Sequence, residues 1–453
     1  MTSLWTSAEI ETLLGMASTA PWSCSGISID SRTLEKGDLF IPLQGESGDG
    51  HAFLNAAAQK EASAAFTSQA WMGDLPSLSV PDTLHALEQL GIAARTRCPA
   101  LRLAVTGSVG KTSTKDMLTW VFKDQGLTHS SVSSYNNQWG VPLTLARMPK
   151  NTQFSIFEMG MNHTGEMRTL THMVKPQISL ITTIAAAHTA FFSSLEEIAR
   201  AKAEIFEGME RGSPVVLNQD NSQFFLLSQM AKDQGLSVFS FGEKGDFHLL
   251  SYTLHPAHST VKANIGGKEV SYTLPVPGKH WVINSLGVLG VVSLAGADVE
   301  KAAHSLATAS APPGRGRCLP GIFTILDESY NANPTSMRAA LAVLGKSEGK
   351  RRIAVIGDMR ELGDEARRYH EELLEPLVEH NIDLVYCCGP FMAHLFERLP
   401  FAMQGAYAPT SLELIPLLKK DILPGDTISV KGSLGTRMKP IVEALMEEQK
   451  RLD

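Results

Sequence analysis

The feature that most restricts how this chain can fold is a glycine-rich turn between an apolar run and a helical pattern. The turn consists of Gly107, Ser108, Val109, Gly110, Lys111, Thr112 and Ser113; it follows the strand-like run Leu101 to Val105 and leads into a helical pattern that ends at Phe122. Glycines let successive backbone N–H groups turn inward around phosphate oxygens, and a helix N-terminus adds positive potential. Lys111 can reach the terminal phosphates, and the Thr112 hydroxyl can bind Mg²⁺. The turn therefore predicts a nucleoside triphosphate site.

This loop is shorter than the general P-loop pattern. That pattern has a glycine five residues before the Gly-Lys pair, where this chain has Val105, the last residue of the predicted strand. The alternative interpretation is a glycine-rich turn with an incidental lysine. The strand and helix on either side favour the phosphate site.

Further apolar runs alternate with helical patterns after this turn. The predicted strands are Phe154 to Phe157, Ile178 to Ile184 and Pro214 to Leu217, and a helix is predicted over Ser194 to Met209. Alternating strands and helices predict a mostly parallel sheet. The same alternation returns later, with strands at Arg352 to Ile356, Leu384 to Cys388 and Thr427 to Val430 and helices at Glu365 to Glu379 and Leu412 to Lys420. The start of the chain adds a strand at Asp38 to Leu43 and helices at Leu54 to Gln59 and Leu84 to Ala94.

The length of 453 residues predicts two to four domains, and proline and glycine interrupt the patterns near Pro99 and Gly314. We therefore expect an α/β protein of three domains. Residues 1–98 form a small N-terminal α/β domain, residues 99–313 a central P-loop ATPase domain with a parallel sheet, and residues 314–453 a C-terminal Rossmann-like α/β domain.

The composition excludes several classes of protein. Hydrophobic residues make up 43% and charged residues 19%, which predicts a globular chain. The net charge of −7, with no long run of one sign, argues against a nucleic-acid partner. The sequence shows no secretory signal and no apolar run of about 20 residues, so we expect no membrane insertion and a cytoplasmic location. The five scattered cysteines are expected to be reduced, buried thiols.

Several polar residues follow predicted strands, where open α/β sheets bind ligands. Glu158 could hold Mg²⁺ beside the phosphates. His188, after the strand that ends at Ile184, is either a metal ligand or a structural histidine. Lys202 and Glu204 read as the solvated face of an amphipathic helix.

Two later segments are also dense in polar groups. Gly314 to Arg317 is either a solvated linker or a flexible source of guanidinium groups for a phosphoryl group. The run Asp327 to Pro334 combines hydrogen-bonding side chains at a strand end and a helix start.

Taken together, these segments resemble the Mur ligase family, ATP-dependent enzymes that form amide bonds in bacterial cell-wall synthesis. The short P-loop, Asn136-Asn137 before Gly140-Val141-Pro142, Glu158, His188 and Lys202 fall in the order found in that family. The same holds for Gly278-Lys279-His280 with Asn284, the Gly314-Arg315 hinge and Lys431-Gly432-Ser433. The resemblance covers essentially the whole chain.

The resemblance implies a role for each matching position. The P-loop residues Gly107 to Ser113, with Asn284, Arg315 and Asp327, would bind ATP, and Thr112, Glu158 and His188 would bind Mg²⁺. Lys111, Lys202, His188 and Arg315 would be catalytic, and Lys202 is similar to a lysine that CO₂ carbamylates in related ligases. Ser31 and Arg32 would bind the uridine-nucleotide end of one substrate, and Asn331 and Asn333 are candidates for the second-substrate site.

Within the family, three segments resemble the member that joins D-alanyl-D-alanine to UDP-N-acetylmuramoyl-tripeptide. They are Ile29 to Arg32 with the nearby Asp49-Gly50-His51, Glu204 to Gly208, and Ser329 to Pro334. The resemblance thus implies these two substrates, an acyl-phosphate intermediate and a monomer. The alternatives are the ligase that adds the third peptide residue, a folate-type polyglutamate ligase, a P-loop nucleotide switch and a kinase. The run from Tyr330 to Pro334 argues against the first two.

Overall fold

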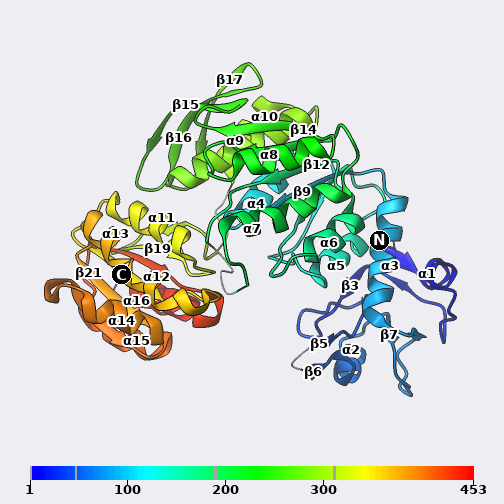
Figure 1. Ribbon diagram of the computed structural model, residues 1–453. Helices are drawn as coiled ribbons and strands as arrows, with labels where there is room; N and C mark the ends of the chain where they lie inside the picture. Colours follow the sequence, from blue (N-terminus) through cyan, green and yellow to red (C-terminus); the bar gives the residue numbers. More distant parts are fainter. Residues whose placement is uncertain (1–2, 46–47, 187–190, 310–312, 453) are drawn as a thin grey trace.

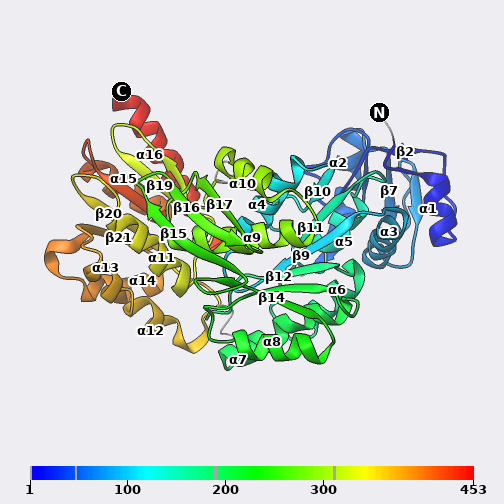
Figure 2. The same cartoon turned by 90° about the horizontal axis from the view of Figure 1, so that it is seen from above.

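The molecule consists of three α/β parts, each built around its own sheet. The computed structural model describes residues 3–45, 48–186, 191–309 and 313–452. A four-stranded N-terminal sheet and a six-stranded C-terminal sheet lie at opposite ends, with a nine-stranded sheet between them (Figures 1 and 2). The predicted α/β class is confirmed, while the domain boundaries after residues 98 and 313 stay a prediction.

The central sheet carries the glycine-rich turn. Its strand order is β10-β11-β9-β12-β13-β14-β15-β16-β17, and the pairings from β10 to β15 are parallel. The parallel strands are β9 (Leu101–Thr106), β10 (Thr128–Ser130), β11 (Phe154–Glu158), β12 (Ile178–Ile181), β13 (Pro214–Asn218) and β14 (Ser237–Gly242). Because β9 and α4 (Lys111–Lys123) flank the turn, the P-loop lies at the carboxyl edge of the sheet.

The last three strands of this sheet were not predicted. β15 (Phe247–Leu254), β16 (Ser259–Ile265) and β17 (Lys268–Leu274) pair antiparallel. Buried and more exposed residues alternate along β16 and β17, which is the period of a strand with one face covered. Gly266 and Gly267, both with positive φ, form the two-residue turn between them. Both the alternation and the Gly-Gly pair can be read in the sequence as signs of a hairpin.

One helix at the middle of the central core is apolar on every side. α9 (Lys279–Leu294) buries Trp281, Val282, Leu286 and Leu289, among others, between the sheet and the helices α4 and α10 (Val299–Thr308). A helix that is hydrophobic all round must be enclosed by protein. The polar Asn284 lies near the start of this helix, and its amide nitrogen lies 2.6 Å from the point that a Cβ on Gly110 would occupy.

The N-terminal sheet has the order β3-β4-β7-β8, with parallel pairings. Its elements are α1 (Ser7–Leu14), β3 (Gly26–Ser28), β4 (Asp38–Phe40), α2 (Leu54–Gln59), β7 (Ala64–Thr67), β8 (Ser77–Ser79) and α3 (Thr83–Arg97). α3 packs against α5 (Gly140–Ala146) of the central part, whose Leu143 and Ala146 belong to the N-terminal core. The N-terminal and central parts therefore share apolar contacts.

The C-terminal sheet has the order β18-β19-β23-β20-β21-β22 and is parallel except for β18. Its strands are β18 (Arg317–Leu319), β19 (Thr324–Glu328), β20 (Arg352–Gly357), β21 (Leu384–Cys388), β22 (Gln404–Ala408) and β23 (Thr427–Lys431). The helices include α11 (Pro334–Gly345), α14 (Pro390–Arg398), α15 (Ser411–Asp421) and α16 (Lys439–Leu452). This parallel α/β arrangement matches the expectation from the sequence.

Three predicted elements differ from the structure. The helix predicted over Glu365 to Glu379 is divided into α12 (Ala366–Glu371) and α13 (Leu374–Glu379), because Pro376 cannot donate to the carbonyl four residues earlier. The strand from Ile178 ends at Ile181. The helix predicted from Ser194 ends at Ala203 as α7 (Leu195–Ala203) and tightens into the 3₁₀ turn η2 (Glu204–Gly208).

All five cysteines are free thiols, and four are buried while Cys318 is partly exposed. In the described ranges, no helix combines the length and the apolar character that a bilayer crossing requires.

Candidate functional site

A cavity of about 930 Å³ lies between the carboxyl edge of the central sheet and the C-terminal part. The central part contributes Ser108 to Ser113, Glu158 and Asn284 to its lining, and the C-terminal part contributes Arg315, Tyr330, Asn331 and Asn333. This volume lies in the upper range of small-molecule sites. The cavity thus gathers most of the site residues predicted from the sequence, although they are spread over more than 200 residues of the chain.

The P-loop is held in shape by the neighbouring strand end. The Ser108 N–H donates to the Thr183 carbonyl at 2.7 Å, and the Thr182 hydroxyl donates to the Val109 carbonyl at 2.6 Å. Gly110 has φ +85°, and Gly107, at φ +142°, would place a Cβ 2.0 Å from the Thr182 hydroxyl oxygen. Both positions therefore require glycine.

Lys111 begins α4 and folds back onto the loop. Its Nζ donates to the Gly107 carbonyl at 2.8 Å. Burial lowers the pKa of Lys111, the negative charge of Glu158 raises it in part, and the positive charge of Arg315 lowers it further. Lys111 and Arg315 therefore bring two cationic groups to one end of the cavity, where a phosphate chain can be bound.

Glu158 ends β11 and offers an unused oxygen. The side chain is 1% exposed, and its Oε1 accepts from Asn136 Nδ2 at 2.7 Å. Its Oε2 is buried and has no hydrogen-bond partner in the described part of the chain. Such an atom is costly to bury, and a carboxylate oxygen is a preferred ligand of Mg²⁺. Glu158 and the cavity-lining Thr112 therefore fit a magnesium site.

Lys202 is fully buried in α7, so the expectation of a solvated face was wrong. Its Nζ has no partner among the described residues. Burial first, and the positive charge of Lys111 second, hold the pKa of Lys202 well below its ordinary value. Burial thus favours the neutral, nucleophilic form of the amine.

Glu204 was expected on the same solvated face and is also buried. Its carboxylate accepts from the backbone N–H groups of Gly165, at 2.8 and 2.9 Å, and Arg168, at 3.2 Å. These groups lie at the start of α6 (Glu166–Val174), where a carboxylate is stabilised by the helix dipole. Glu204 therefore holds α6 in place against η2.

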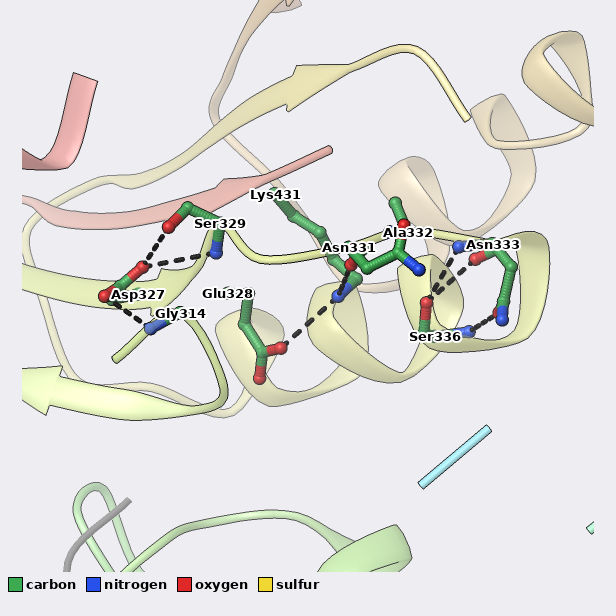
Figure 3. A network of polar contacts seen from close by, with 9 residues as sticks. All are labelled: Gly314, Asp327, Glu328, Ser329, Asn331, Ala332, Asn333, Ser336 and Lys431. Carbon is green, nitrogen blue, oxygen red and sulfur yellow. Dashed lines mark hydrogen bonds and ion pairs between the residues drawn. The ribbon is translucent and has the colours of Figure 1, made fainter. Parts of the chain in front are cut away.

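Asp327 organises the hinge rather than the cavity wall (Figure 3). One carboxylate oxygen accepts from the Gly314 N–H at 2.8 Å, and the other accepts from the Ser329 hydroxyl at 2.6 Å. Both oxygens are thus occupied, and the side chain is buried. The carboxylate thereby fixes the chain just before Arg315, and the contact with adenosine implied for Asp327 stays a prediction.

The turn after β19 carries Asn331 and Asn333 (Figure 3), and both residues line the cavity. Asn333 caps α11, its side-chain oxygen accepting from the Ser336 N–H at 2.8 Å. The Asn331 side-chain oxygen accepts from the Ala332 N–H at 2.9 Å. Lys431 stabilises the turn: its Nζ donates to the Asn331 carbonyl at 3.0 Å and forms an ion pair with Glu328 Oε2 at 3.3 Å. In the described part of the chain, no hydrogen bond is found at Nδ2 of Asn331 or Asn333, so both groups are available to a ligand.

The remaining predicted residues lie elsewhere. Ser31 and Arg32 follow β3 at the N-terminal end and do not line the cavity; the Arg32 side chain is 87% exposed and pairs with Asp30. Gly107 and Lys202 are not part of the cavity lining, and His188 lies outside the described residues. Among the described residues, no group of three or more His, Cys, Asp or Glu side chains could hold a metal ion.

The polar cavity residues Ser134, Asn136, Tyr330 and Lys431 were not among the predicted site residues. Three of them fall in motifs that the sequence displays. Ser134 carries no such signal, because a single serine in a loop rich in serine does not stand out.

Known proteins match this chain over nearly its whole length. Residues 23–90 match the catalytic domain of the Mur ligase family, residues 105–292 the Mur ligase middle domain, and residues 314–434 the Mur ligase glutamate ligase domain. The chain is 32% identical over 446 residues to the UDP-N-acetylmuramoyl-tripeptide--D-alanyl-D-alanine ligase of Rickettsia prowazekii, covering 97% of this chain and 99% of the relative. It is 33% identical over 460 residues to the ligase of the same name from Escherichia coli K12, with 99% of each chain covered.

Solved structures agree with these sequence relatives. A crystal structure of MurF from Acinetobacter baumannii superposes with a TM-score of 0.87 at 29% identity, covering 98% of this chain and 99% of that one. The MurF ligase of Thermotoga maritima, in complex with ADP, has the same fold, with a TM-score of 0.81 at 23% identity over 94% of this chain and 98% of that one.

The buried amine of Lys202 predicts a pH-dependent stability. Between the lowered pKa and the ordinary value, the unfolded chain binds a proton that the folded chain lacks, so the native stability rises with pH by up to about 1.4 kcal/mol per unit. The variant Lys202→Met lacks this proton linkage. In buffer free of carbon dioxide, its stability relative to the native protein should therefore be greater at pH 7 than at pH 9, as measured by chemical denaturation.

The matched control is Lys232→Met, on the exposed face of α8 (Phe224–Asp233). Its stability difference from the native protein should not change between the two pH values. An equal difference at both pH values for Lys202→Met would contradict a neutral buried amine.

Proposed function

The chain belongs to the Mur ligase family, and from this premise we propose that it joins D-alanyl-D-alanine to UDP-N-acetylmuramoyl-tripeptide while ATP is converted to ADP and phosphate. The product is UDP-N-acetylmuramoyl-pentapeptide, a precursor of peptidoglycan. The observation that carries the proposal is one cavity that combines a P-loop with the amide-bearing turn of the C-terminal part. Full-length relatives that bear this activity in their names support it.

The reaction needs a leaving group on the peptide carboxylate. A carboxylate oxygen attacks the γ-phosphorus of ATP, the bond to the β-phosphate oxygen breaks, and an acyl phosphate and ADP result. The amine of D-alanyl-D-alanine then attacks the acyl carbon and loses a proton, and the tetrahedral intermediate collapses to an amide and phosphate. The P-loop N–H groups and Lys111 hold the phosphates, and Arg315 offsets the charge that develops during transfer.

The other site residues would bind parts of the three substrates. Asn284, beside Gly110, would face the adenosine, and Asn331 and Asn333 would hold D-alanyl-D-alanine through their free amide groups. Ser31 and Arg32 would bind the uridine end of the other substrate. We expect the enzyme to act as a monomer in the cytoplasm.

Mg²⁺ fits the free oxygen of Glu158 and the hydroxyl of Thr112, with His188 as a further ligand carried over from the family. The ion would neutralise phosphate charge during transfer. Glu158 itself is oriented by Asn136, which leaves its second oxygen directed away from that bond.

Lys202 is proposed to be carbamylated. Its neutral amine would attack carbon dioxide, forming an N–C bond and releasing one proton to solvent, so that a buried group without a partner becomes an anion. That anion would be stabilised by the neighbouring charge of Lys111 and would enlarge the metal site.

The activity is tested by phosphate release from ATP with UDP-N-acetylmuramoyl-tripeptide, with D-alanyl-D-alanine present, omitted or replaced by single amino acids. Release should require both substrates, and mass spectrometry should show the pentapeptide nucleotide. Release with the dipeptide nucleotide and a diamino acid would instead indicate the neighbouring ligase of the family. Release without any carboxylate substrate would indicate a nucleotide switch.

Glu158→Gln tests the metal site. The variant keeps the bond with Asn136 in reach but removes the charge, so the rate of ligation should fall on the order of tenfold or more, and half-maximal activity should require more Mg²⁺. Glu196→Gln, on the exposed side of α7, is the matched control and should retain the native rate. An unchanged magnesium requirement in Glu158→Gln would remove Glu158 from the site.

The carbamate is tested by supplying ¹³C-labelled bicarbonate. Native protein should show a carbamate carbon resonance that Lys202→Met lacks. Exposed lysines are protonated at neutral pH and do not react with carbon dioxide, whereas a buried, neutral Lys202 amine does. Active native protein without this resonance would contradict the modification.

A further inference from the structure

Ser134 joins the P-loop to the C-terminal part through one hydroxyl group. It lies in the loop between β10 and α5, on the central side of the cavity. Its Oγ lies 3.0 Å from Arg315 Nη2, 2.9 Å from the Tyr330 hydroxyl and 3.1 Å from the Thr112 hydroxyl. Residues from three distant parts of the chain thus meet at a single atom.

A hydroxyl group can accept two hydrogen bonds and donate one, and this limit fixes the direction of the three bonds. Ser134 Oγ has two lone pairs and one hydrogen. Arg315 can only donate, and Tyr330 donates its hydroxyl hydrogen, so both lone pairs are occupied. The Ser134 hydrogen is therefore left for Thr112, which accepts it and retains a second lone pair for a metal ion. The bonds run from the C-terminal part, through Ser134, to the P-loop.

Ser134 also holds Arg315 without cancelling its charge. The guanidinium carbon lies 3.9 Å from the centre of the Tyr330 ring, which supports one face of the group. No salt bridge between Arg315 and a carboxylate is found in the described part of the chain. A neutral acceptor and an aromatic face therefore orient the cation and leave its full charge available to an anion in the cavity.

We propose that Ser134 is a positioning residue that holds Arg315 and Tyr330 against Thr112, so that the hinge arginine faces the transferring phosphoryl group. This role rests on the proposed function. Ser134 should affect phosphoryl transfer more than nucleotide binding. The groups proposed to hold the phosphates, the P-loop N–H groups and Lys111, make no contact with Ser134. A change at Ser134 should therefore act on kcat rather than on KM for ATP.

Ser134→Ala tests the proposal in the full-length enzyme under the ligation assay. We expect kcat to fall at least tenfold, while KM for ATP changes less than threefold. Tyr330→Phe keeps the ring under Arg315 and removes one donor, so its kcat should fall about threefold. In the double variant the loss should equal that of Ser134→Ala alone, because the two residues act through the same bond.

Ser131→Ala is the matched control, since the Ser131 hydroxyl is buried and has no partner among the described residues. It should keep the native kcat. The proposal is overturned if Ser134→Ala keeps kcat within twofold, if KM for ATP takes up the whole effect, or if the losses of the two single variants multiply. Native protein that forms no ligation product would contradict the proposed function instead, so the two failures are distinguishable.

Discussion

A parallel sheet brings the carboxyl ends of its strands to one edge, and the phosphate and metal groups of the central part depend on this geometry. β9 delivers the P-loop, β11 delivers Glu158, and the segment after β12 holds the loop through Thr182 and Thr183. The strands themselves are buried by apolar residues on both faces, so their positions are fixed by packing. The chemistry is therefore carried by short segments whose backbones have little freedom to move.

The site holds several polar groups that the protein itself does not satisfy. One oxygen of Glu158 and the amine of Lys202 are buried without partners in the described structure, and Arg315 is held by a neutral serine. Each such group costs free energy in the folded protein, and each is of the type that a metal ion, carbon dioxide or phosphate would satisfy. The unsatisfied groups thus identify the chemistry of the ligands better than the satisfied ones do.

The parts of the site that sequence could predict are those encoded locally. Gly107 and Gly110 impose a backbone shape, and Glu158 directly follows a strand, so their places could be inferred from neighbouring residues. Lys202 could not be placed, because only the packing of α7 against α8 and η2 shows that its side of the helix is enclosed. Ser134 could not be assigned either, since its partners lie in the P-loop and in the C-terminal part, and no sequence spacing records those contacts.

The two ends of the molecule are joined to its centre in different ways. The N-terminal part shares an apolar core with α5, and Trp5 donates to the carbonyl of Ala146 in that helix. The C-terminal part is bonded to the centre beside the cavity by the Arg315 and Tyr330 side chains, which donate to the Ser134 hydroxyl, and apolar side chains such as Trp281 and Val343 also line the cavity. When an apolar contact separates it exposes surface that can associate with other molecules, whereas polar groups are simply hydrated. Separating the N-terminal part would therefore expose the apolar core that it shares with α5, whereas breaking the bonds of Arg315 and Tyr330 to Ser134 would expose groups that water can satisfy.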